Sequence, residues 1–112
     1  MPILVAVRDL VFRSKIQAAA DRLGVPLELA PRGAPLAEAA RDLGSGTVLM
    51  DLNEPGAVDK IGAVKAAGAR VVGFLGHLQQ ELIEAAEAAG ADVVLTRGQF
   101  VQRLDDLLRA GA

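Results

Sequence analysis

Acidic, amide and basic side chains stand directly after apolar runs at three places in this sequence. They are Arg8 and Asp9, then Asp51, Asn53 and Glu54, and finally Arg97. Carboxylate and amide oxygens are the ligands that Mg²⁺ prefers, whereas arginine pairs with carboxylates and phosphates through charge-assisted hydrogen bonds. These residues therefore offer either a site for a hard cation or a site in which arginine neutralises a carboxylate.

The chain lacks the side chains of an enzyme that acts alone. It has no cysteine, no Gly-x-Ser-x-Gly segment and one histidine, His77, which we interpret as a loop residue or the cap of the following helix. Without cysteine, disulfides and thiolate metal sites are excluded, and a cytoplasmic location is expected. We expect no catalytic activity from the chain.

Short apolar runs predict the strands that position these side chains. The runs are rich in β-branched residues and continuously apolar, which is typical of parallel strands with helices on both faces of the sheet. They are Ile3–Val7, Thr47–Leu52, Val71–Leu75 and Val93–Thr96, with a weaker run at Leu27–Ala30.

Segments with helical periodicity follow each predicted strand. The first has its apolar residues, among them Val11, Ile16 and Leu23, near one face. The others run roughly over Ala34–Leu43, Gly56–Ala67, Leu78–Ala89 and Gln99–Arg109. The first four are followed by Gly24, Gly44, Gly68 and Gly90, the residue type that best ends a helix in a left-handed conformation. We interpret two further glycine pairs, Gly73-x-x-Gly76 and Gly44-Ser45-Gly46, as turns.

Five strand and helix units predict an α/β fold, a (βα)₅ doubly wound parallel sheet between two helical layers. The expected strand order is 2-1-3-4-5, in a three-layer sandwich formed by a single domain over residues 1–112. In such a sheet, ligands bind beyond the carboxyl ends of the strands, where the strand order reverses. The polar residues named above would meet in a crevice at that edge.

The segment around Asp51 resembles a known phosphorylation site. Val48-Leu49-Met50-Asp51-Leu52-Asn53-Glu54-Pro55-Gly56 is similar to the part of bacterial response-regulator receiver domains that carries the phosphoacceptor aspartate, with a proline four residues later. Asp51 takes the place of the acceptor, and Asn53 that of the residue whose backbone carbonyl binds the metal. The resemblance extends over almost the whole chain and implies a flavodoxin-like, receiver-like domain of two-component signalling.

Other positions depart from what the receiver resemblance requires. Val7 and Arg8 stand where the family has an acidic pair, and only a one-residue shift would bring in Asp9. Leu75 stands at the position of the switch hydroxyl, and Arg97 at that of the lysine. The resemblance therefore implies a degenerate receiver, or pseudo-receiver, that binds neither Mg²⁺ nor another cofactor.

We expect the remaining aspartate to be neutralised by an arginine. Asp51 would then be a vestigial phosphoacceptor, and Arg8 or Arg97 would pair with it in place of the metal. Two simpler interpretations stay open. Asp51 to Pro55 could be only a loop that supports the next helix, and Asp9 could only open the first helix.

A stand-alone signalling domain that acts by protein–protein interaction is the leading functional hypothesis. Its partner, or a second copy in a homodimer, would bind the face of the fourth helix, fifth strand and fifth helix. The formal charge of −2 favours neither nucleic acid nor an anionic membrane, and the first apolar run is too short to span a bilayer. The alternatives are a small-ligand or anion-binding domain or enzyme subunit that uses Arg8 and Arg97, and a genuine phosphoacceptor receiver that uses Asp51.

Overall fold

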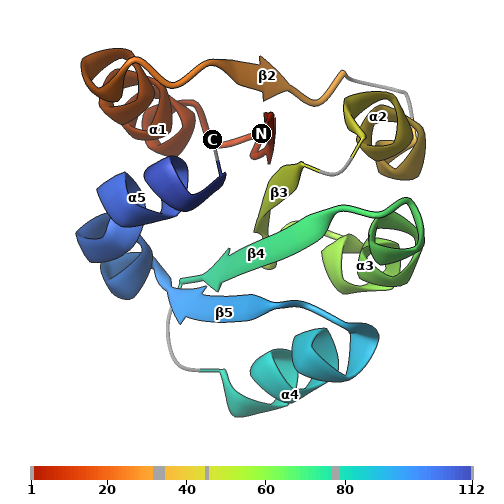
Figure 1. The fold of residues 1–112 in the computed structure, drawn as a ribbon. Helices are drawn as coiled ribbons and strands as arrows, with labels where there is room; N and C mark the ends of the chain where they lie inside the picture. The colour runs from red at the N-terminus through yellow and green to blue at the C-terminus, as the bar shows by residue number, and fades with distance from the viewer. Residues whose placement is uncertain (1, 32–34, 45, 77–78, 112) are drawn as a thin grey trace.

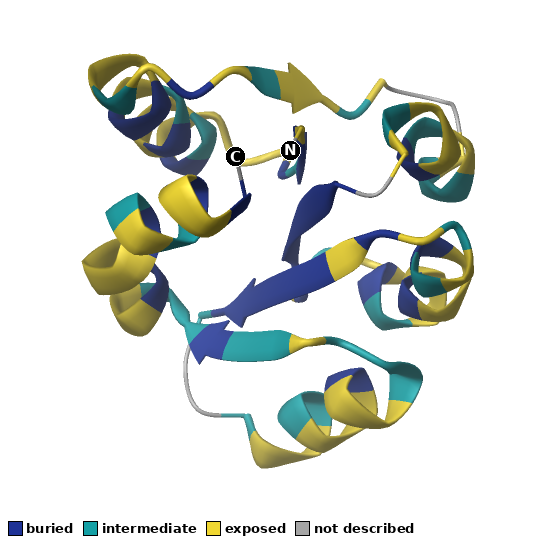
Figure 2. Cartoon of the chain, in the orientation of Figure 1, coloured by how far each residue is buried: buried dark blue, intermediate teal, exposed yellow. Residues whose placement is uncertain are grey.

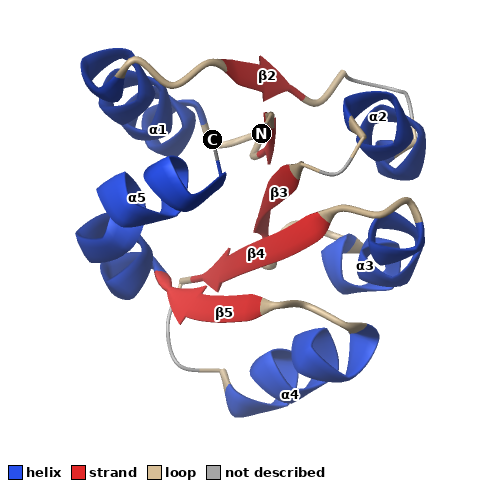
Figure 3. Ribbon diagram, in the orientation of Figure 1, coloured by secondary structure: helices blue, strands red, loops and turns tan. Residues whose placement is uncertain are grey.

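Five strands alternate with five helices in the computed structural model (Figures 1 and 3). The structure describes residues 2–31, 35–44, 46–76 and 79–111, so His77, Ser45 and the predicted helix starts at Ala34 and Leu78 lie outside the described residues. The elements are β1 (Ile3–Ala6), α1 (Leu10–Leu23), β2 (Leu27–Leu29), α2 (Leu36–Leu43), β3 (Thr47–Asp51), α3 (Ala57–Ala66), β4 (Arg70–Leu75), α4 (Gln80–Ala89), β5 (Val93–Thr96) and α5 (Arg97–Gly111).

The strands form one parallel sheet in the order β2-β1-β3-β4-β5, which confirms the predicted fold class and topology. Helices α1 and α5 pack together on one face, and α2, α3 and α4 lie on the other (Figure 1). Their arrangement is the expected three-layer sandwich. Because all strands are parallel, their carboxyl ends meet at a single edge of the sheet.

Two apolar cores lie on the two faces of the sheet, and the three central strands are almost wholly buried (Figure 2). The core under α1 and α5 contains all three aromatic residues of the chain. Phe74 on β4 lies between Phe12 and Phe100, with ring centroids 4.7 Å and 4.5 Å apart. The opposite core consists of aliphatic side chains and alanines, including Leu52, Ile61 and Ala86. The small alanines let the helices approach the sheet closely.

Two local predictions need correction. Gly73 is not a turn residue: it lies inside β4, where the side chain of Leu52 covers it so closely that an added Cβ would lie 2.8 Å from Leu52 Cδ1. Gly44 has a φ of 80° but a ψ of −139°, so it does not adopt the left-handed helical cap seen at Gly24 and Gly90. The other strand and helix boundaries fall within one or two residues of those predicted.

An ion pair joins α3 to the residue that precedes β5. Asp92, which precedes β5, accepts hydrogen bonds of 2.8 Å from Lys65 Nζ and from the backbone N–H of Val71. Partial burial alone would raise the pKa of Asp92, but the hydrogen bond from Lys65, the backbone hydrogen bond and the nearby positive charges outweigh it and lower the pKa. The carboxylate is therefore held in its charged form.

Within the described residues, no helix combines the length and the apolar character needed to cross a membrane.

Candidate functional site

The carboxyl ends of β1, β3 and β5 deliver the predicted polar residues to the same edge of the sheet, but in two separate groups. Asp51 ends β3 and lies with Asn53 and Arg97. Arg8 follows β1 and lies with Glu54. The predicted crevice is thus divided between a buried aspartate and a more exposed ion pair.

Asp51 is a buried carboxylate with two partners. The residue is only 5% exposed. Its Oδ1 accepts a hydrogen bond of 3.0 Å from the backbone N–H of Asn53, and its Oδ2 lies 3.4 Å from Arg97 Nη2. Burial of a carboxylate away from water costs free energy, and hydrogen bonds and a nearby cation offset that cost.

Arg97 is held over the crevice by packing as well as by charge. It is the first residue of α5, and its guanidinium carbon lies 5.6 Å from the centroid of the Phe12 ring. A guanidinium over an aromatic face gains cation–π attraction. The Nε of Arg97 is buried and has no hydrogen-bond partner among the described atoms. The contact with Asp51 is made by Nη2.

Arg8 does not pair with Asp51. Its backbone N–H donates to Glu54 Oε2 over 2.9 Å, and its Nε lies 3.8 Å from Glu54 Oε1. The side chain of Arg8 is 76% exposed. Of the two arginines considered from the sequence, Arg97 is therefore the one that lies against the buried aspartate.

Asp9 is used by the first helix. Its carboxylate accepts a hydrogen bond of 3.1 Å from the backbone N–H of Phe12, which makes it the N-cap of α1. This geometry satisfies an amide at the helix start and places negative charge at the positive end of the helix dipole. These contacts fit the interpretation in which Asp9 only opens the first helix, and not one in which it contributes to a metal site.

Asn53 joins two loops at the edge of the sheet. Its Oδ1 accepts a hydrogen bond of 2.6 Å from the backbone N–H of Gly76, and its Nδ2 donates to Gln79 Oε1 over 2.8 Å. The loop after β3 is thereby tied to the residues that follow β4. Leu75, at the position of the family's switch hydroxyl, is fully buried in the core below them.

The residues at this edge do not suit a magnesium site. In the described part of the chain, no three His, Asp or Glu side chains lie close enough together to hold a metal ion. Asp9 is occupied as a helix cap, and the cation nearest to Asp51 is the guanidinium of Arg97. A divalent ion at Asp51 would meet one carboxylate and a neighbouring positive charge, which is a poor donor set for Mg²⁺.

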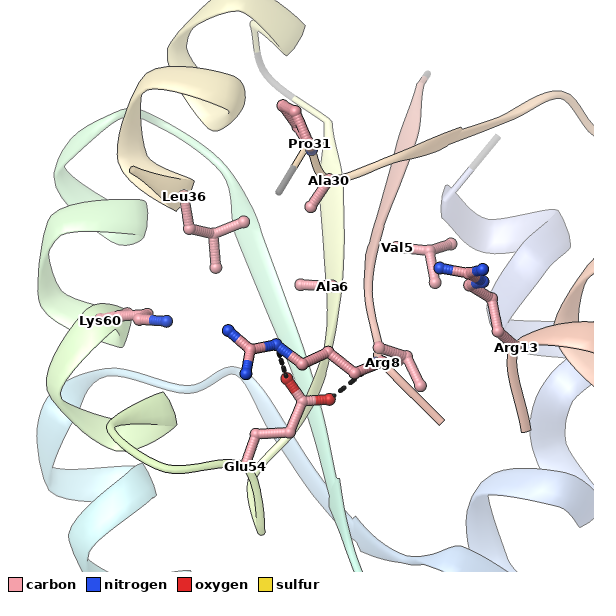
Figure 4. Close-up of a pocket in the computed structure, with 10 residues that line it drawn as sticks. Val5, Ala6, Arg8, Arg13, Ala30, Pro31, Leu36, Glu54 and Lys60 are labelled. Carbon is pink, nitrogen blue, oxygen red and sulfur yellow. Dashed lines mark hydrogen bonds and ion pairs between the residues drawn. The ribbon is translucent and has the colours of Figure 1, made fainter. Parts of the chain in front are cut away.

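Sequence reasoning missed two features of this edge. The first is a cavity of about 330 Å³ beside β1, lined in part by Arg13 and Lys60 as well as by Arg8 and Glu54 (Figure 4). In the sequence, Arg13 is only one of the polar residues of an amphipathic helix, and Lys60 has no signal of its own. The second feature is a reciprocal cap at the start of α5, where Thr96 and Gln99 bond to each other's backbone N–H. Its signal, Thr-x-x-Gln, was present in the sequence.

No protein-family model and no curated protein matches this sequence. Many solved structures share its fold. A response regulator from Hahella chejuensis has a TM-score of 0.79 at 17% identity, over 96% of this chain and 92% of that one. A receiver domain from Rhodospirillum rubrum has a TM-score of 0.71 at 22% identity, over 96% and 90%.

A third similar structure contains a phosphorylated aspartic acid. It is a response regulator from Burkholderia pseudomallei with a phosphorylated aspartic acid, a calcium ion and citrate. It has a TM-score of 0.76 at 17% identity, over 99% of this chain and 72% of that one. The chain described here therefore has the receiver fold that the resemblance implied.

Proposed function

We propose that this chain is a cytoplasmic signalling domain with the receiver fold that binds a protein partner and is not phosphorylated. The contact between Arg97 and the buried Asp51 is the observation that carries the proposal. A fixed guanidinium supplies the positive charge that a phosphoacceptor site takes from a metal ion. The domain would then stay in one conformational state instead of switching between two.

Phosphoryl transfer to Asp51 would need charge that this edge does not provide. An incoming phosphoryl group is repelled by a carboxylate unless a divalent ion neutralises both. The carboxylate of Asp9 caps α1, and Arg8 stands where a second acid would be needed. The donor set that remains favours a permanently paired aspartate.

The coupling between phosphorylation and a conformational change also lacks the hydroxyl side chain that it needs. A switch residue must reach a phosphoryl oxygen with a hydroxyl hydrogen, and leucine has none. Leu75 is instead fully buried in the core shared with α3 and α4. Even if Asp51 were phosphorylated, Leu75 could not donate a hydrogen bond to the phosphoryl group.

Labelling by acetyl phosphate in the presence of Mg²⁺ tests the proposal. We expect no labelling of the native chain and no Mg²⁺ binding at millimolar concentration, measured by intact-mass spectrometry and by isothermal titration. Stoichiometric labelling that disappears in Asp51→Asn would overturn the proposal.

A variant with the missing parts restored serves as the matched control. Arg8→Asp, Leu75→Thr and Arg97→Lys together return an acid, a hydroxyl and a lysine to the positions at which the family has them. Mg²⁺ binding should appear in this triple variant and not in a variant with the exposed residues Glu28→Asp and Arg103→Lys changed. Mg²⁺ binding by the triple variant would show that the residues at these three positions prevent Mg²⁺ binding in the native chain.

The partner would bind the face formed by α4, β5 and α5. β5 is an edge strand of the sheet, with α4 and α5 on either side of it (Figure 1). Helix α4 carries three exposed glutamates and no basic residue, and Ala85 and Ala88, which each follow a glutamate, are also exposed. Small side chains permit close approach, and the acidic helix favours a basic partner surface. Helix α5 of a second copy carries the exposed Arg103 and Arg109, although Arg109 also lies 3.6 Å from the exposed Asp106 of its own helix.

A further inference from the structure

We propose that the cavity beside β1 binds a small organic anion, a carboxylate or phosphate group carried on a compact apolar body. This site is separate from the Asp51 contact, because neither Asp51 nor Arg97 lines the cavity. The inference goes beyond partner binding, because it gives the domain a small-molecule ligand as a second signal. Four polar side chains and an apolar wall carry it.

The charged lining of the cavity is mostly positive. Arg8, Arg13 and Lys60 are cationic, and Glu54 is the single carboxylate among them. Glu54 is already bound by Arg8 through both its backbone N–H and its side chain. Among the described residues, Arg13 and Lys60 make no ion pair. Two positive charges are therefore left without compensation in one concave site.

The basic side chains approach the cavity from different elements. Lys60 comes from α3 and points toward the guanidinium of Arg8, which reaches across from the end of β1 (Figure 4). Arg13 comes from α1 and lies near Val5 (Figure 4). The Arg8 guanidinium and the Lys60 ammonium converge in this way, whereas Arg13 lies on the other side of β1 in this view (Figure 4). The two converging cations repel each other, and an anion between them is attracted to both. The exposed ion pair between Arg8 and Glu54 is weak, so the Arg8 side chain can turn from Glu54 to a bound anion at little cost in free energy.

Apolar residues complete the lining of the cavity, and the apolar surface that they expose favours an organic anion over an inorganic one. This apolar wall is formed by Val5, Ala6, Val7, Ala30, Pro31 and Leu36. The volume of about 330 Å³ lies at the lower end of the range for small-molecule sites. Inorganic phosphate would leave this wall in contact with water, whereas an aromatic or branched aliphatic body would cover it and gain hydrophobic free energy.

An NMR titration of the full chain with phenyl phosphate tests this proposal. We expect saturable shifts of the backbone amides of Ala6, Arg8 and Lys60, with binding at least tenfold tighter than that of inorganic phosphate or phenol. Binding should weaken with added salt, because charge contributes to it. Absence of saturation up to 10 mM phenyl phosphate, at about 0.05 M ionic strength, would overturn the proposal. So would equal affinity for phenyl phosphate and inorganic phosphate.

Charge-neutral variants assign the binding to this cavity. Lys60→Gln should weaken phenyl phosphate binding by at least about tenfold, the usual effect of one lost charge-assisted hydrogen bond. Lys15→Gln on α1 and Arg41→Gln on α2, which are exposed and outside the cavity, should leave the affinity within twofold. Equal losses in the cavity and control variants would show that binding follows net charge alone, and the proposal would fail.

Discussion

Asp51 depends on Arg97 because the two side chains differ in their access to water. Asp51 is buried, whereas the Arg97 side chain is 40% exposed and can be hydrated without a partner. Removal of the arginine charge would thus leave an uncompensated carboxylate, while removal of the aspartate charge would leave a solvated cation. The cost of breaking the pair is asymmetric.

Arg97→Met tests this asymmetry at a single residue. Methionine keeps an apolar stem over Phe12 but removes the charge, so we expect the free energy of unfolding to fall by about 1–3 kcal/mol. Asp51→Asn in the same chain should recover part of the loss. Urea unfolding measures both changes. Arg41→Met, at an exposed position of α2, is the control, and equal destabilisation by both substitutions would contradict the predicted role of Arg97.

Sequence patterns could not decide which arginine meets Asp51. Arg8 and Arg97 both follow strands whose carboxyl ends lie at the same edge, so topology brings both near the aspartate. The choice comes from tertiary packing: Glu54 engages Arg8, and the ring of Phe12 lies under Arg97. Neither contact has a signal in local sequence spacing.

Helix α5 begins directly after β5 because a reciprocal cap closes its first turn. Thr96 Oγ1 accepts from the backbone N–H of Gln99 over 3.2 Å, and Gln99 Oε1 accepts from that of Thr96 over 3.0 Å. The helix therefore starts at Arg97, two residues before the predicted Gln99. This early start places the Arg97 side chain at the edge of the sheet, beside Asp51.

Thr96→Ala tests the contribution of this cap to the element. We expect a loss of about 1 kcal/mol in the free energy of unfolding, the usual cost of removing an N-cap hydroxyl. Amide hydrogen exchange in the first turn of α5 should become faster. Ser14→Ala, at an exposed position within α1, is the matched loss of a hydroxyl outside any cap. An unchanged exchange rate at Gln99 would contradict the prediction.

The elements themselves were largely predictable from the sequence. Continuous apolar runs identify parallel strands because helices cover both faces, and this condition holds for the buried β1, β3 and β4. Prediction failed where a distant side chain decides the local role. Gly73 resembles a turn residue by composition, yet Leu52 requires a glycine there within a strand. The cavity was missed because it combines Lys60 with residues from five other parts of the chain.

At the scale of the whole molecule, the proposed interface combines charges of opposite sign from neighbouring helices. Glu81, Glu84 and Glu87 are exposed on α4, and Arg103 and Arg109 are exposed on α5. In a twofold symmetric dimer each α4 could face the partner's α5, so the same contact would form twice. The charge pattern therefore supports self-association as one form of the proposed partner binding.

Sedimentation equilibrium tests this form of the interface. At high micromolar concentration we expect a mass above that of the monomer, and Glu84→Arg should weaken association by about tenfold through repulsion from the partner's arginines. Glu28→Arg, which makes the same charge change at the opposite edge of the sheet, is the control. A native chain that remains monomeric and retains no protein in pull-down experiments would weigh against this interface.

The cluster of three phenylalanines has a consequence for how this protein is observed. The sequence has no tryptophan and no tyrosine, so its near-ultraviolet absorption comes from Phe12, Phe74 and Phe100 alone. All three rings are in contact in one core, and Arg97 lies over the first of them. Their circular dichroism is therefore an intrinsic optical signal from a single place, without an introduced label, and it is sensitive to what happens to the guanidinium beside Asp51.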